Sequence, residues 1–316
     1  MNHSNYKGLT RREVISKAGS GLLVALLASK VSAASGLLKS TSGFHLEHAP
    51  DSNPGIITTN TTDGRTVKVT VWHGRGKKKG LILFSHGLGS SPDKYNRLMK
   101  PWSDAGYDIL APMHVDSADH PDRDKYKQEE SWPTRLHDMK AVAALYPQER
   151  FIAAGHSYGG MVALTLGGAT PLYPPGFTGK MDDPNAIASL ALSPPGPIPV
   201  LLPAEAYNTI SVPAFIQTGT LDVFQPDGPP WQSHLTAYEH APVGDKYALV
   251  LDGVDHGFGG LIYNLEKKGN SQEDQLQILI QQSQLFIDGY GAGSNAAKLK
   301  LRKMIGKNGL ADLSCK

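Results

Sequence analysis

Short apolar runs alternate with amphipathic segments along most of the chain. Apolar runs with the length of buried strands occur at residues 81–85, 108–113, 151–155, 187–192, 212–217 and 247–251. Helical spacing of apolar residues occurs at residues 95–105, 134–145, 158–166, 231–240 and 272–286. Strands that alternate with helices in this way form βαβ units with right-handed crossovers. The pattern therefore predicts an α/β fold, with a mostly parallel central sheet and helices on both faces.

The segments at either end of this alternation complete the predicted domain. Gly55–Asn60 and Thr66–His73 alternate around a turn signal and predict a hairpin. A final helix is expected after Gly293, and no internal repeat or second-domain boundary is visible, so residues 55–316 are predicted to form one domain. Within it, repeated prolines in Pro194–Pro203 exclude a regular crossover helix. That loop is expected either to form a wall of a substrate pocket or to pack on the surface.

The first 34 residues have the organisation of an export signal. The pair Arg11-Arg12 precedes a short apolar run, Gly21–Ala28, and a stretch of small residues that ends at Ala34. This order is typical of a twin-arginine signal peptide, although Val14 stands where that motif usually has phenylalanine. The apolar run is far shorter than the roughly 20 residues that span a bilayer. We expect residues 1–34 to be removed; an uncleaved membrane anchor is the alternative.

Export implies a periplasmic or secreted protein with no stable membrane insertion after cleavage of the signal. Residues 35–54 are rich in Ser, Gly and Pro and are expected to form a flexible N-terminal arm.

The single cysteine, Cys315, excludes an intramolecular disulfide. A net charge of +2 with scattered basic residues gives no indication of a nucleic-acid partner. The sequence gives no indication of an oligomeric state.

The clearest chemical motif is Gly155-His-Ser-Tyr-Gly159, which lies between a predicted strand and a predicted helix. It matches the G-x-S-x-G nucleophile elbow, in which a tight turn exposes the serine hydroxyl and glycines on either side avoid collisions. The helix that follows presents free N–H groups to developing negative charge. Ser157 is therefore the predicted nucleophile.

A second glycine-rich turn, Ser85-His-Gly-Leu-Gly89, follows the first predicted parallel strand. A tetrahedral intermediate needs two N–H donors, and we assign these to the backbones of Leu88 and Tyr158. We interpret His86 as a residue that shapes this loop rather than as a base. The turn matches neither G-x-x-x-x-G-K-[ST] nor G-x-G-x-x-G, so nucleotide binding is not expected.

A base and an orienting acid should follow the nucleophile in the order Ser, Asp, His. Asp222 and His256 each lie just past the C-terminal end of a predicted strand, where open parallel sheets present their sites. His256 would accept the serine proton, and Asp222 would fix its tautomer. Asp255 is the rival acid, but neighbouring side chains on a turn rarely align for a hydrogen bond to Nδ1.

These motifs together resemble the α/β-hydrolase superfamily. The likeness spans about residues 55–303 and rests on Phe84–Ser90, Gly155–Gly160, Gly219–Asp222, Asp255–Gly257 and the tail Phe286–Tyr290. Within the superfamily the chain is most similar to the branch of dienelactone-hydrolase-like and platelet-activating-factor acetylhydrolase-like esterases. Dienelactone hydrolases carry a cysteine nucleophile, whereas position 157 is serine, which favours general ester hydrolysis.

The resulting hypothesis is a serine carboxylic-ester hydrolase that forms an acyl-enzyme on a small-molecule or lipid ester and needs no cofactor. The alternatives are a lipase or phospholipase, and a binding protein that keeps the fold without turnover. His114, Asp116, Asp119 and His120 offer metal-ligand chemistry, but no metal is expected because a serine triad needs none. A polar loop at the mouth of the site is the favoured interpretation of these four residues.

Overall fold

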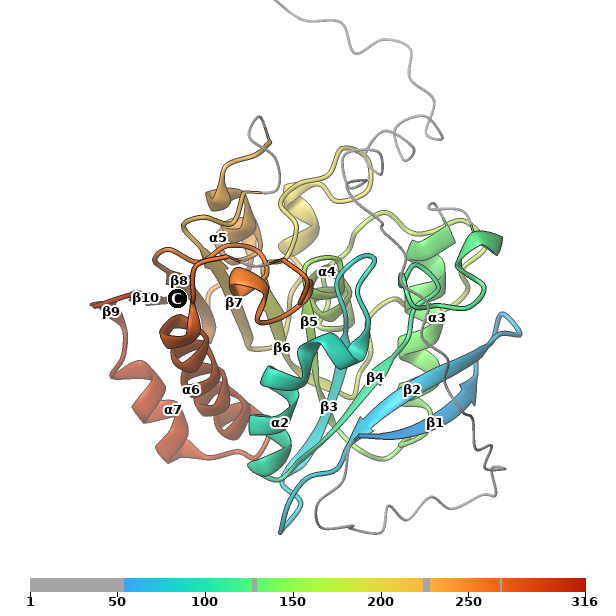
Figure 1. The fold of residues 1–316 in the computed structure, drawn as a ribbon, viewed down its shortest axis with the longest axis horizontal. Helices are drawn as coiled ribbons and strands as arrows, with labels where there is room; N and C mark the ends of the chain where they lie inside the picture. The colour runs from blue at the N-terminus through green and yellow to red at the C-terminus, as the bar shows by residue number, and fades with distance from the viewer. Residues whose placement is uncertain (1–53, 127–129, 224–227, 268) are drawn as a thin grey trace, which may run out of the picture.

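The computed structural model describes residues 54–126, 130–223, 228–267 and 269–316. Their strands form one sheet in the order β1-β2-β4-β3-β5-β6-β7-β8-β10-β9 (Figure 1). The strands are β1 Gly55–Asn60, β2 Thr66–Trp72, β3 Gly80–Ser85, β4 Tyr107–Pro112, β5 Phe151–His156, β6 Ala186–Leu192, β7 Ala214–Gly219, β8 Lys246–Leu251, β9 Gly306–Asn308 and β10 Ala311–Cys315. The central strands β4, β3, β5, β6, β7 and β8 are parallel, and antiparallel strands border them on both sides.

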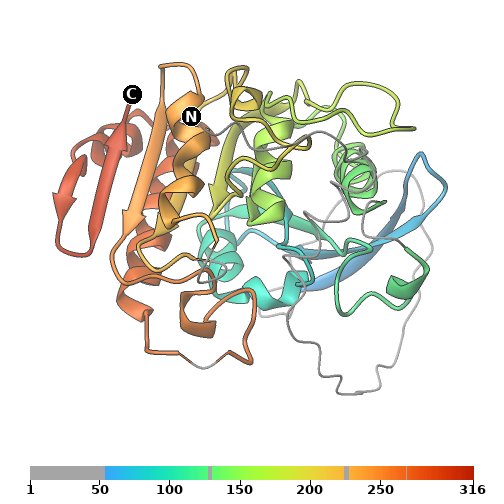
Figure 2. The same ribbon diagram turned by 90° about the horizontal axis from the view of Figure 1, so that it is seen from above.

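Helices cover both faces of this sheet, as the view from above shows (Figure 2). One core contains side chains of α3 Ser131–Ala143, α4 Tyr158–Leu166 and α5 Thr236–His240. The other contains side chains of α2 Asn96–Asp104, α6 Glu273–Tyr290 and α7 Asn295–Arg302. Along β3, Leu81 and Leu83 enter the first core, and Ile82 and Phe84 enter the second. Alternate side chains of a strand point to opposite faces, so a wholly apolar strand suits a sheet covered on both sides. The predicted fold class is confirmed.

Most predicted elements lie close to the observed ones, with two differences of note. The helix expected over residues 231–240 is the 3₁₀ turn η5 Trp231–Leu235 followed by the short helix α5. The strands β9 and β10 were not predicted, although β10 pairs with β8 along five residues and extends the sheet. As expected, no helix forms in the segment Pro194–Pro203, in which Leu202 is fully buried in the first core.

The proposed signal segment, residues 1–34, and nearly all of the arm at 35–54 lie outside the described residues. Among the helices that the structure does describe, none combines the length and apolar character needed to cross a membrane.

Candidate active site

Ser157 occupies a strained turn between β5 and α4. Its backbone angles are φ 54° and ψ −122°, a conformation that residues with side chains rarely adopt. The flanking glycines are sterically required. A Cβ on Gly155 would lie 2.1 Å from the carbonyl oxygen of Gly159, and one on Gly159 would lie 1.9 Å from that of Ser85. The sequence therefore closes the turn only with glycine at both positions, and this holds Ser157 at the C-terminal end of β5.

Asp222 and His256 meet in the structure. Asp222 lies in the turn after β7 with its side chain fully buried, and His256 Nδ1 donates to its Oδ1 at 2.7 Å. The other carboxylate oxygen accepts a hydrogen bond from the hydroxyl of Thr218 at 3.0 Å. Burial opposes ionisation, but the neighbouring His256 and the hydrogen bonds to the carboxylate hold the pKa of Asp222 well below its ordinary value. The pair thus has the contact that an orienting acid needs.

Asp255 has a different set of partners. Its Oδ1 accepts the N–H groups of Gly257 at 3.1 Å and Gly259 at 2.8 Å, and its Oδ2 pairs with Lys267 at 3.0 Å. These contacts shape the turn that carries His256.

His156 connects the elbow with the loop that holds His256. The Gly87 N–H donates to the Tyr95 hydroxyl at 3.0 Å, and that hydroxyl donates to His156 Nδ1 at 3.0 Å. His156 Nε2 then donates to the carbonyl of His256 at 2.9 Å, and the two imidazole centroids are 4.6 Å apart. Burial, together with the charge that His256 can carry, holds the pKa of His156 well below its ordinary value, so this ring stays neutral. The sequence motif contains His156 but does not reveal this positioning contact.

Side-chain donors bind the carbonyl groups of the turn after β3. The Gly87 carbonyl accepts from His86 Nδ1 at 2.8 Å and from Arg135 Nη2 at 3.4 Å. A trans peptide places its C=O and N–H on opposite sides, so the Leu88 N–H points away from Arg135. Tyr158 is the first residue of α4, where the N–H groups have no intrahelical acceptor. His86 thus shapes the loop, in agreement with its interpretation from the sequence.

Arg135 anchors this turn from a fully buried position. It forms a bidentate ion pair with Asp116 at 2.9 and 2.7 Å and donates to the His86 carbonyl at 2.6 Å. Its guanidinium also lies 4.7 Å from the ring centroid of Tyr158. Arg135 therefore contacts the backbone of the turn that precedes Leu88 and the side chain of Tyr158, and no motif in the sequence indicated it.

Ser85, His114 and Asp138 form a second Ser–His–Asp arrangement behind the turn. His114 Nε2 lies 2.9 Å from the Ser85 hydroxyl, and Nδ1 lies 2.8 Å from Asp138 Oδ2. All three side chains are fully buried, and Ser85 also accepts a hydrogen bond from Arg135, so a substrate has no access to this hydroxyl. His114, considered above as a possible metal ligand, thus has protein partners at both ring nitrogens.

Among the described residues, one set of three ligand-type side chains, Asp222, His234 and His256, has donor atoms within 4.8 Å of one another. Hydrogen bonds from both histidines to Asp222 account for this spacing. His234, which the sequence gave no reason to select, thus belongs to the same cluster.

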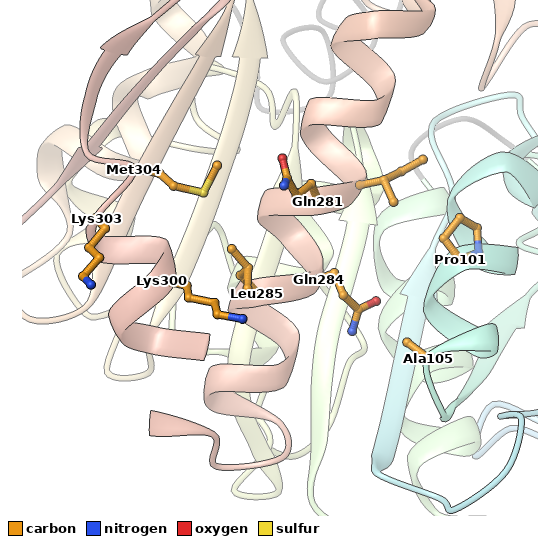
Figure 3. Close-up of a pocket in the computed structure, with 9 residues that line it drawn as sticks. Pro101, Ala105, Gln281, Gln284, Leu285, Lys300, Lys303 and Met304 are labelled. Carbon is orange, nitrogen blue, oxygen red and sulfur yellow. The ribbon is translucent and has the colours of Figure 1, made fainter. Parts of the chain in front are cut away.

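A surface hollow lies elsewhere, between α2, α6 and α7 (Figure 3). Its labelled lining residues include Pro101, Leu285 and Met304, together with Lys300 of α7 and Lys303 just after that helix. The lining contains no member of the predicted Ser–His–Asp set, so the hollow plays no part in the chemistry considered below.

Comparison with known proteins gives a family and several structural neighbours. The model of the alpha/beta hydrolase family matches residues 82–263. A thermophilic esterase from the planctomycete Thermogutta terrifontis is 16% identical, with a TM-score of 0.53 over 76% of this chain and 93% of its own. The same enzyme has also been solved phosphonylated by cyclosarin (15% identity, TM-score 0.51, 76% and 95% covered). An alpha-beta serine hydrolase homologue from Coxiella burnetii is 15% identical, with a TM-score of 0.52 over 74% of this chain and 99% of its own. No curated protein matches the sequence significantly.

Proposed function

The chain belongs to the α/β-hydrolase family, and on this basis we propose that it is a serine hydrolase that cleaves carboxylic esters through an acyl-enzyme. The observation that carries the proposal is the 2.7 Å contact between His256 Nδ1 and the buried Asp222 carboxylate. His156, which directly precedes the strained Ser157, contacts the backbone of His256 and so joins the two parts. The esterase neighbours support the same class of reaction, although at 15–16% identity their likeness concerns the fold.

In the proposed reaction, the Ser157 hydroxyl attacks the ester carbonyl carbon while His256 takes its proton. Asp222 keeps the Nδ1–H tautomer in place and stabilises the imidazolium that forms. The N–H groups of Leu88 and Tyr158 stabilise the negative charge on the tetrahedral oxygen. The intermediate then collapses, His256 protonates the leaving alcohol, and the acyl group remains on Ser157. Water, deprotonated by His256, attacks the acyl-enzyme. This second intermediate collapses, His256 returns the proton to the Ser157 oxygen, and the carboxylic acid leaves.

A panel of p-nitrophenyl esters, from acetate to palmitate, tests the proposal. We expect turnover of at least the short esters, and added hydroxylamine should divert part of the product to the acyl hydroxamate, because it competes with water for the acyl-enzyme. A preference for long chains would move the assignment to a lipase or phospholipase. A folded protein that hydrolyses no ester in the panel would contradict the proposal and favour the binding-protein alternative.

A further inference from the structure

His234 lies between two loops that border the candidate site. It belongs to the 3₁₀ turn η5, and its Nδ1 lies 2.7 Å from the carbonyl oxygen of Pro194, in the loop after β6. On the other side of the ring, Nε2 lies 3.2 Å from the carbonyl oxygen of Asp222 and 3.3 Å from its Oδ1. The ring therefore joins the loop after β6 to the turn after β7.

Each nitrogen of this ring faces only acceptors among these partners. A carbonyl oxygen and a carboxylate oxygen have no proton to donate, so each contact needs an N–H on the histidine. Neutral imidazole carries one N–H, and its second nitrogen would then place a lone pair against oxygen. The imidazolium form carries two N–H groups and can donate to the acceptors at both ring nitrogens. Because the residue is only 9% exposed, bulk water offers little compensation for a mismatched pair.

From this geometry we propose that His234 is a positioning residue that is doubly protonated at neutral pH, which ties Pro194 to Asp222 and sets the charge environment in which His256 acts as a base. The inference rests on the proposed function, and it adds a fourth residue to the predicted Ser–His–Asp set. His234 acts through Asp222 and is not assigned any contact with the substrate.

The surrounding charges favour this protonation state. Burial lowers the pKa of His234, but the hydrogen bond to the Asp222 carboxylate and its charge raise it above the ordinary histidine value. Other titratable groups near the ring, among the residues that the structure describes, are His256, at 6.0 Å between ring centroids, and the neutral His156. Within the described part of the chain, Asp222 is the carboxylate whose charge and hydrogen bond raise this pKa.

A charged His234 has a consequence for the pH dependence of the reaction. Two histidines share one carboxylate, so the positive charge on His234 disfavours a second positive charge on His256. Removing the His234 charge should therefore displace the acid limb of the pH–rate profile. For two charges 6.0 Å apart, Coulomb's law with an effective dielectric constant between about 80 and 20 gives a displacement of about 0.5 to 2 pH units.

The first test is the ring protonation itself, measured by ¹⁵N NMR on the wild-type protein at pH 7. We expect both ring nitrogens of His234 to carry a proton, and a one-proton ring would overturn the proposal. This measurement needs no variant and no substrate, so it stands apart from the assignment of Ser157. If Ser157→Ala keeps full esterase activity while His234 is doubly protonated, the proposed function fails and the charge assignment survives.

The second test is the pH profile of kcat/KM for His234→Gln, which removes the charge but keeps a hydrogen-bonding side chain. The midpoint of its acid limb should rise by about 0.5 to 2 pH units. His240→Gln, an exposed histidine at the end of α5, is the matched control and should leave the midpoint unchanged. A His234→Gln midpoint equal to that of the wild type would show that the side chain is only structural and would overturn the proposal.

Discussion

The exchange Asp222→Asn separates the two candidate acids. The amide has the size of the carboxylate, but it carries no charge, and its NH₂ group can donate to His256 Nδ1 and so favour the wrong tautomer. In the structure the carboxylate lies 2.7 Å from Nδ1 and is fully buried. A charge pair about 4 Å apart at an effective dielectric constant near 20 is worth about 4 kcal/mol, or roughly 10³ in rate. With the tautomer penalty, kcat should fall by about 10⁴.

Asp255→Asn is the matched control on the neighbouring turn. The amide oxygen still accepts the N–H groups of Gly257 and Gly259, and the pair with the exposed Lys267 contributes about 1 kcal/mol or less. Its kcat should therefore fall by less than about tenfold. The assay is kcat for a p-nitrophenyl ester at saturating concentration, with urea unfolding to show that both variants are folded. A severe loss in Asp255→Asn with an active Asp222→Asn would refute the assignment of the acid.

Three further predictions concern stability and export. Asp116→Asn leaves the buried charge of Arg135 without its partner, so the free energy of unfolding by urea should fall by about 3–5 kcal/mol, whereas Asp312→Asn at an exposed position of β10 should stay within about 0.5 kcal/mol. The pKa values of Asp116 and Asp222 are both lowered in the folded protein. Their contribution to the free energy of unfolding is therefore present above the unfolded pKa of about 3.9 and is lost as the pH falls below it. Urea unfolding at pH 7, 5 and 3 should show a steep loss of stability only between pH 5 and pH 3. Mass spectrometry of protein from the producing cells should find the mature N-terminus close to Ala34, and an intact Met1 would contradict processing.

The sequence predicted the central sheet well because burial on both faces requires nearly continuous apolar strands. Each of these strands therefore has a local signal, as in Leu81–Phe84 and Phe151–Ala154. The strand β9 has only three residues, all exposed, and β10 alternates buried and exposed positions near the end of the chain. β10 pairs with the edge of β8, and β9 pairs with β10. These tertiary contacts have no local apolar run that would reveal them in the sequence.

In the candidate site, too, the residues with a local sequence signal were predicted and those defined by tertiary contacts were not. Ser157, Asp222 and His256 each follow a strand, so the order of strands and the motif spacing were enough to select them. Arg135 and His234 act through contacts with residues distant in the sequence, His86 at 49 positions and Pro194 at 40. Such contacts exist only once the loops have been folded together, and neither residue lies in a motif that marks its role.

The role of Ser157 is the centre of the account, and covalent labelling tests it most directly. The protein is incubated with a fluorophosphonate probe, its mass is measured intact, and the modified peptide is identified. We predict one adduct per chain, located on Ser157, with loss of esterase activity in proportion to labelling. Ser157→Ala should be neither labelled nor active, while the exposed Ser314→Ala should behave as the wild type. An adduct at another residue, or full esterase activity in Ser157→Ala, would contradict the account.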